Sequence, residues 1–142
     1  MIFLAHLAAT WYMVGLIWFV QLVHYPLFGG VGEPGYRAYA EQHQRRTTWV
    51  VGPPMLVEAA TGAWLALHPP ASLGRPLFVA GLVLLGAVWL STALLQVPRH
   101  TELGAGYSAR AHGALVRTNW LRTVAWSARG ALVLAAALRL LR

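Results

Sequence analysis

The chain has 142 residues, of which 58% are hydrophobic, and a formal net charge of +7. All its basic side chains other than histidine are arginines, and it contains neither aspartate nor cysteine. This composition excludes disulfides, thiolate metal sites, cysteine nucleophiles, Schiff-base lysines and Ser-His-Asp triads. It is also too apolar for an ordinary soluble domain. The arginines flank apolar segments, which points to a lipid bilayer rather than nucleic acid as the partner.

Apolar runs of roughly membrane-spanning length follow one another along the chain, at residues 2–23, 49–67, 77–97 and 120–141. About 20 apolar residues suffice for a transmembrane helix. The first run has no basic segment before it and is longer than a signal-peptide core, so we interpret it as retained. The second run contains Pro53 and Pro54, which predict a helix start or a kink there. We therefore expect an all-α, integral membrane four-helix bundle in a single domain, residues 1–142.

A polar sequence appears twice between these runs, as GYRAYAEQHQRRTTW at 35–49 and GYSARAHGALVRTNW at 106–120. The two copies are 71 residues apart. Since the first and third spans run in the same direction, this spacing predicts a parallel internal repeat that pairs residues 1–67 with 77–142. Each polar segment has a helix-forming composition. We expect two short interfacial helices, at 35–48 and 106–117.

The distribution of arginines predicts an orientation. With four crossings both termini lie on one side, and the polar loops lie on the other. The loop side holds Arg37, Arg45, Arg46, Arg99, Arg110 and Arg117, and the terminus side holds Arg75, Arg139 and Arg142. Basic loops favour the cytoplasm. We therefore expect a multi-pass protein of the bacterial inner membrane with both termini outside.

Charged groups inside the spans indicate where helices face one another. Glu58 and Arg129 are also 71 residues apart, so the repeat places them at equivalent depths. They could form a structural ion pair, or Glu58 could be a catalytic or proton-relay carboxylate. In the fourth run Asn119, Arg122 and Arg129 share one helical face. Buried polar groups of this kind usually face the bundle interior.

Histidines gather at the loop side, while His6 and His68 are expected near the opposite surface. The candidate metal ligands are His24, His43, His100 and His112. Imidazole with carboxylate suits a transition metal, and we expect iron or copper in preference to zinc. Haem held by two histidines is an alternative, and so is a belt of interfacial histidines that never converge. The predicted site adds Glu58 and Arg122 as catalytic groups, and Gln21, Gln96, Asn119 and Arg129 as cofactor-binding groups.

Several short motifs are similar to a known group of proteins. They are HYPLF at 24–28, GPPMLVEA at 52–59, QVPRH at 96–100 and TNWLRTVAW at 118–126. They resemble a family of uncharacterised four-helix bacterial membrane proteins, which is itself similar to the anthrone-oxygenase-like domain family. The resemblance implies oxygenase or quinone and aromatic redox activity. It matches the family at Pro98, Asn119 and Arg122.

Two classes of function fit these features. The first is a metal-dependent membrane oxidoreductase or oxygenase whose lipophilic, quinone-like or aromatic substrate enters from the bilayer. The second is a non-enzymatic membrane protein, either a small ion or metal transporter or an accessory subunit of a larger membrane complex. A homo-oligomer is compatible with both.

Overall fold

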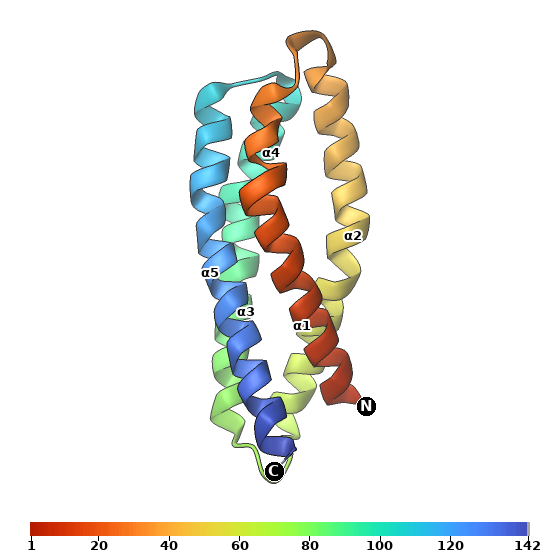
Figure 1. Ribbon diagram of the computed structural model, residues 1–142, viewed down its shortest axis with the longest axis vertical. Coiled ribbons are helices and arrows are strands. Elements are labelled where there is room, and N and C mark those ends of the chain that lie inside the picture. Colours follow the sequence, from red (N-terminus) through yellow and green to blue (C-terminus); the bar gives the residue numbers. More distant parts are fainter. Residues whose placement is uncertain (142) are drawn as a thin grey trace.

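The computed structural model describes residues 1–141 and consists of helices standing side by side (Figure 1). Four stretches are long and apolar enough to cross a membrane: Ile2–Gly30, Pro34–Leu67, Arg75–Ala105 and Ala109–Leu140. They run alternately up and down, so the two ends of the chain lie at the same end of the bundle (Figure 1). No strand occurs among residues 1–141. The predicted all-α four-helix bundle is confirmed, and Arg142, the last residue of the second predicted repeat, lies outside the described residues.

The two halves of the chain have the same order of elements. The first half consists of α1 (Ile2–Phe19), a π-helical turn η1 (Val20–His24), a 3₁₀ turn η2 (Pro26–Gly30) and α2 (Glu33–Leu67). The second consists of α3 (Arg75–Ser91), a π-helical turn η3 (Thr92–Gln96), α4 (Val97–Ala105) and α5 (Ala109–Leu140). Helix α1 packs against α2 and α5, and α3 packs against the same two helices. The repeat of 1–67 and 77–142 stays a prediction, which this shared order supports.

The two π-helical turns have the same local cause. Each turn ends two residues before a proline, Pro26 or Pro98. Proline has no N–H for the carbonyl four residues earlier, and its ring clashes with that carbonyl. The helix widens by one residue instead: the Tyr25 N–H bonds to the Val20 carbonyl at 2.9 Å. Such π-bulges often occur at functional sites.

The two short interfacial helices predicted at 35–48 and 106–117 are not separate elements. Residues 35–48 form the first part of α2, which continues to Leu67 through Pro53 and Pro54. The helix neither starts nor ends at these prolines. Likewise α5 begins at Ala109 and absorbs the second polar segment, with the Ser108 hydroxyl accepting from the Ala111 N–H at 3.2 Å. Neither segment contains a residue that would break the backbone hydrogen bonding, so each helix continues.

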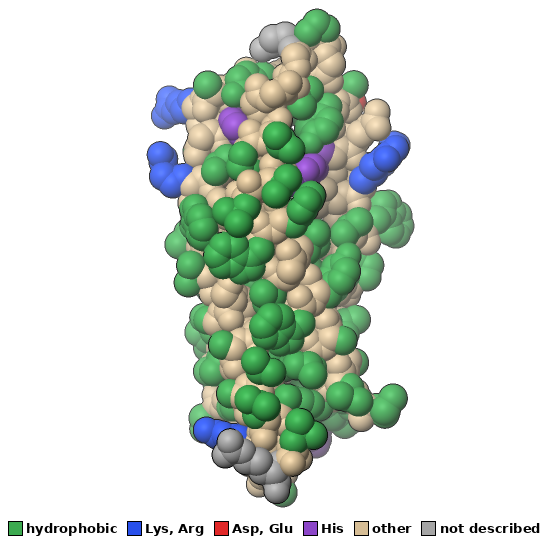
Figure 2. All heavy atoms as spheres, in the orientation of Figure 1, with side chains coloured by type: hydrophobic (Ala, Val, Ile, Leu, Met, Phe, Trp, Pro, Cys, Tyr) green, Lys and Arg blue, Asp and Glu red, His purple; other side chains and the backbone are tan. Residues whose placement is uncertain are grey.

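The outer surface supports a membrane location. Large apolar side chains, including Leu22, Leu56, Val83 and Leu121, are exposed along all four stretches. In Figure 2 such side chains cover the middle of the visible face, and arginines gather mainly toward the end opposite the termini. The 35 residues of α2 span about 52 Å at ~1.5 Å each. Since hydrocarbon is about 30 Å thick, the polar first part of α2 extends the bundle beyond it.

Candidate polar site between the helices

A buried arginine is the centre of the loop-side polar network. Arg122 on α5 is 8% exposed. Its Nε donates to Asn119 Oδ1 at 2.9 Å, and its Nη2 donates to the Tyr25 hydroxyl at 3.1 Å. The ion pairs among residues 1–141 are Arg37–Glu41, Arg99–Glu102 and Arg129–Glu58. Arg122 is thus a buried cation held by neutral groups, and none of the carboxylates whose side chains are described, those of Glu41, Glu58 and Glu102, pairs with it.

Tyr25 and His100 form a hydrogen-bonded pair next to this arginine. The Tyr25 hydroxyl lies 2.9 Å from His100 Nε2. Because a guanidinium can only donate, the Tyr25 oxygen accepts from Arg122, and its own hydrogen is available to His100. Tyr25 is the last residue before Pro26, so the π-helical turn η1 determines its position. The three side chains come from the end of η1, from α4 and from α5.

Amide side chains support the network from behind. Asn119 Nδ2 donates to Gln21 Oε1 at 2.8 Å, and Gln21 Nε2 donates to the Val116 carbonyl at 3.2 Å. Gln96 accepts from the Thr118 hydroxyl at 3.2 Å. One buried cluster therefore contains Gln21, Asn119 and Arg122. Gln96 lies on the neighbouring turn η3. The hydrogen bonds from Gln21 through Asn119 fix the orientation of the Arg122 guanidinium.

A cavity of about 210 Å³ opens beside Arg122. Its lining consists of Tyr25, His43, Gln44, Thr47, Thr48, Val51, Thr92, Gln96, Val97, His100 and Arg122. Thr48 on α2 and Val97 on α4 are exposed on the outside of the bundle. The cavity thus lies between α2 and the stretch that contains η3 and α4, with polar groups inside and apolar groups at its edge.

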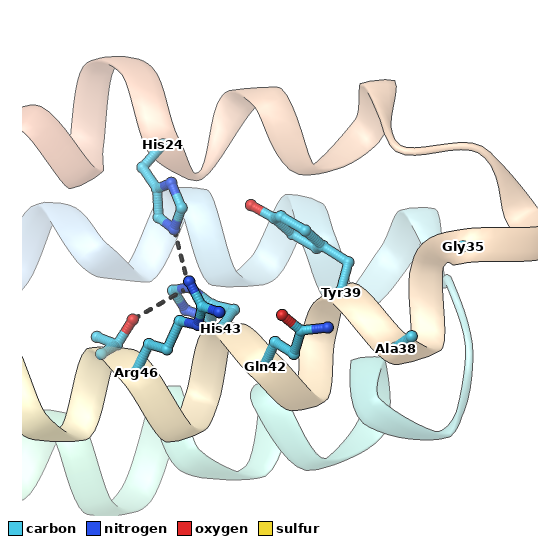
Figure 3. Close-up of a pocket in the computed structure, with 8 residues that line it drawn as sticks. His24, Gly35, Ala38, Tyr39, Gln42, His43 and Arg46 are labelled. Atoms are coloured by element: carbon cyan, nitrogen blue, oxygen red, sulfur yellow. Dashed lines mark hydrogen bonds between the residues drawn. The ribbon is translucent and has the colours of Figure 1, made fainter.

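A second cavity, of about 500 Å³, lies between η1 and α2 (Figure 3). Its lining includes His24, Tyr39, His43 and Arg46. His24 Nε2 lies 2.8 Å from His43 Nδ1, which is also 3.1 Å from the Thr47 hydroxyl. His43 lines both cavities, and its ring centroid is 5.2 Å from that of His100. Three of the predicted histidines, His24, His43 and His100, therefore converge.

The fourth predicted histidine lies apart from this group. His112 Nε2 donates to the Tyr25 backbone carbonyl at 2.7 Å, because a carbonyl can only accept. Its Nδ1 is 3.4 Å from the Tyr107 hydroxyl. His112 thus holds the end of η1 against α5, and the structure does not bring it to the other imidazoles.

The converging histidines do not have the arrangement of a metal site. No group of three or more His, Asp or Glu side chains within residues 1–141 is placed to hold a metal ion. His24 and His43 direct nitrogens at each other, and His100 Nε2 is bonded to Tyr25. A ligand nitrogen must instead offer its lone pair to the metal. These donors therefore fit a hydrogen-bonded chain better than a coordination sphere.

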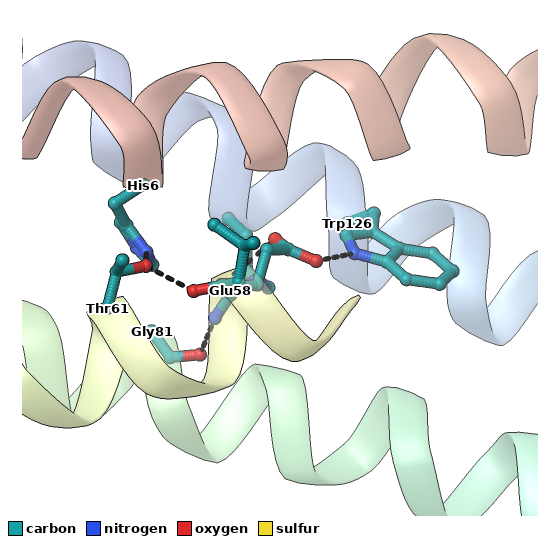
Figure 4. Close-up of polar contacts among 7 residues, drawn as sticks. His6, Glu58, Thr61, Gly81 and Trp126 are labelled. Carbon is teal, nitrogen blue, oxygen red and sulfur yellow. Dashed lines mark hydrogen bonds and ion pairs between the residues drawn. The ribbon is translucent and has the colours of Figure 1, made fainter. Parts of the chain in front are cut away.

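Glu58, which Figure 4 shows beside Trp126, forms a separate site with Arg129 deeper in the bundle. Glu58 Oε1 lies 3.1 Å from Arg129 Nη2, and both side chains are almost completely buried. Trp126 Nε1 donates to Glu58 Oε2 at 2.9 Å, and Arg129 Nη1 donates to the Gly81 carbonyl. The predicted ion pair is confirmed. Neither residue lines the histidine cavities, so the structure does not bring them to the site in which the sequence placed them.

Three further residues of these networks were not among the predicted site residues. Tyr25 bonds both Arg122 and His100, and its position four residues after Gln21 was the available signal. Thr47 bonds His43 and belongs to the repeated polar sequence. His6 was expected near the surface, but it is 3% exposed and bonds Thr61 at 2.8 Å. His6 lies in the first apolar run, where Thr10 is its only polar neighbour on the same helical face. The sequence therefore gave no hint that Thr61 is its hydrogen-bond partner.

Comparison with known proteins adds no relative. No family model, no curated protein and no solved structure matches the chain. The resemblance to the anthrone-oxygenase-like domain family therefore stays a prediction, and the function has to be argued from the site itself.

Proposed function

We propose that this membrane protein binds the oxygen-bearing head group of a lipophilic, quinone-like or aromatic molecule in the 210 Å³ cavity, as part of an oxidoreductase reaction. The observation that carries the proposal is Arg122, a buried guanidinium without a carboxylate partner that lines this cavity beside Tyr25 and His100. A buried charge is costly unless it is paired. A ligand oxygen that is or becomes negatively charged would supply the missing partner.

The chemistry of a quinone fits this set of groups. Its reduction to the quinol adds two electrons and two protons, and negative charge appears on the oxygens in between. Arg122 stabilises that charge because its hydrogen bonds to Asn119 and Tyr25 already orient the guanidinium. In the Tyr25–His100 pair, the hydroxyl oxygen of Tyr25 lies 2.9 Å from the basic Nε2 of His100, next to the cavity. The electrons come from a redox partner outside the chain, in keeping with membership of a larger membrane complex.

The cavity also suits the apolar part of such a molecule. Val51 and Val97 line it, and Val97 is exposed on the outside of the bundle. A head group can therefore enter from the bilayer while its tail remains among the lipids. If the protein binds the molecule but never turns it over, it is an accessory subunit, which is the non-enzymatic alternative.

The direct test is the affinity for decylubiquinone, a quinone with a short alkyl tail, measured by calorimetry in detergent. We expect saturable binding at one site per chain. The control ligand is decylbenzene, which has the same tail and no oxygens. Losing hydrogen bonds to a charged group costs roughly 1.5–3 kcal/mol. Decylbenzene should therefore bind roughly 10 to 100 times more weakly than decylubiquinone. Equal, non-saturating uptake of both compounds would contradict the proposal.

A resident transition metal, iron or copper, or a haem is a separate proposal. The convergence of His24, His43 and His100 favours it, and the mutual hydrogen bond of His24 and His43 opposes it. Elemental analysis and an absorption spectrum of detergent-purified protein decide it. From the donor arrangement we expect less than one metal ion per chain, and stoichiometric iron or copper would show that the histidines rearrange around it.

The orientation in the membrane follows from the arginines. We propose that the protein lies in a bacterial inner membrane with both termini outside and the arginine-rich end in the cytoplasm. A C-terminal alkaline phosphatase fusion should then be active, and a C-terminal green fluorescent protein fusion should be dark. The opposite pair of results would reverse the orientation.

A further inference from the structure

We propose that His24 and His43 form a proton relay that connects the surface cavity between η1 and α2 with the cavity beside Arg122. This inference deepens the proposed function and rests on it for its purpose, since quinone reduction consumes protons. It assigns a role to the second cavity and to His24, which does not line the ligand cavity.

The positions of His24 and His43 relative to the two cavities support a relay. His43 lines both cavities, and His24 lines only the surface cavity. Their nitrogens are 2.8 Å apart, a distance over which a proton moves directly along a hydrogen bond. Figure 3 shows the two rings pointing at each other across the gap between the helices. His43 thus lies between the two spaces together with Thr47, which also lines both, and His24 contacts it from the surface side.

The outer cavity has access to water. Its lining includes Gln42 and Arg46, which are exposed. They lie in the polar first part of α2, which extends beyond the hydrocarbon thickness. His24 is half-buried, whereas His43 is 8% exposed. The pair therefore runs from the surface cavity toward the protein interior.

The transfer can be written atom by atom. His24 takes a proton from water at Nδ1 and becomes an imidazolium. Its Nε2–H bond breaks as an N–H bond forms at His43 Nδ1, so the positive charge passes to His43. Both hydrogen bonds of His43 use Nδ1, which leaves its Nε2 proton for an acceptor in the inner cavity. That acceptor is the ligand oxygen in the inner cavity, because His100 Nε2 already accepts from the Tyr25 hydroxyl. Turning of the rings restores the starting tautomers.

The neighbours keep the pair aligned. The Thr47 hydroxyl lies 3.1 Å from His43 Nδ1. Phe28 packs edge-on against both imidazoles, with centroid distances of 5.2 Å to His24 and 4.9 Å to His43. The titratable and charged groups that face the relay are Tyr25 at the end of η1, Tyr39 and Arg46 from α2, and His100 from α4, with Arg122 beyond His100. The side chains of Glu41, Glu58 and Glu102 bond other partners and neither imidazole, so none of these carboxylates holds the proton on the way.

The test measures exchange of the His43 ring proton with water by NMR of ¹⁵N-histidine-labelled protein in detergent, with no quinone present. In His24→Phe, a ring remains to pack on Phe19 and Phe28 but carries no nitrogen. We expect exchange at His43 to slow by roughly tenfold or more, as for loss of a positioned proton carrier. His68→Phe, at the opposite end of the bundle, should leave it unchanged. If His24→Phe does not fold, His24→Gln is expected to show the same slowing.

Unchanged exchange in the folded His24 variants would overturn the relay, because water would then reach His43 directly. Decylubiquinone affinity is a separate readout. His24 does not line the inner cavity, so its variants should bind the quinone as the unaltered protein does. Loss of quinone binding in every protein would contradict the proposed function without affecting the exchange result.

Discussion

Replacing Glu58 with glutamine should lower the midpoint of thermal unfolding in detergent by roughly 10 °C. Glu58 and Arg129 are buried at a separation of 3.1 Å. The substitution removes the negative charge and leaves Arg129 buried without compensation. Breaking a buried pair from one side costs about 3–5 kcal/mol, and each kcal/mol corresponds to a few degrees for a chain of this size. Circular dichroism during a thermal scan measures the change.

The chain provides a matched control for this result. Glu102 pairs with Arg99 at 2.8 Å, but both side chains are more than two-fifths exposed. Exposed pairs contribute about 0–1 kcal/mol, so Glu102→Gln should shift the midpoint very little. A double variant, Glu58→Leu with Arg129→Leu, should be less destabilised than the sum of its single variants. If Glu58→Gln and Glu102→Gln have the same small effect, the buried pair does not stabilise the bundle.

Replacing Arg122 with glutamine should weaken decylubiquinone binding by roughly 10 to 100 times. Among the described residues that line the 210 Å³ cavity, Arg122 is the only basic side chain besides His43 and His100. Glutamine keeps donors of similar reach and removes the charge, so the loss reports charge-assisted hydrogen bonding, worth about 1.5–3 kcal/mol. Calorimetry in the same detergent measures it.

Arg117→Gln is the control because it removes a charge from the same helix. Arg117 is exposed and lines neither histidine cavity. Its loss should leave the affinity unchanged. Equal weakening by both substitutions would mean that overall charge, rather than the buried guanidinium, attracts the ligand.

The sequence was sufficient for features that depend on local pattern. Apolar runs separated by polar segments predict four helices because each span must satisfy its backbone hydrogen bonds internally. The Glu58–Arg129 pair followed from the repeat and from the cost of an unpaired buried charge. Both inferences depend on spacing along the chain, which the sequence states directly.

The sequence did not predict contacts that depend on how distant segments are placed relative to one another in the bundle. Tyr25 and His100 are 75 residues apart, and their contact depends on how η1 and α4 are rotated in the bundle. The separate interfacial helices were wrong because polar composition does not by itself end a helix. His43 and Glu58 both lie on α2, but about 22 Å of helix at ~1.5 Å per residue separates them, so they belong to different networks.

The position of a bound quinone tests the central proposal most directly. An azido-decylubiquinone can be cross-linked to the detergent-purified protein by light, and the labelled peptides can be identified by mass spectrometry. Binding beside Arg122 predicts labels in residues 43–51 of α2 and 92–100 of η3 and α4, which excess decylubiquinone should suppress. Labels spread over the exposed apolar faces of α1 and α5, with no protection by excess quinone, would contradict a quinone site in this cavity.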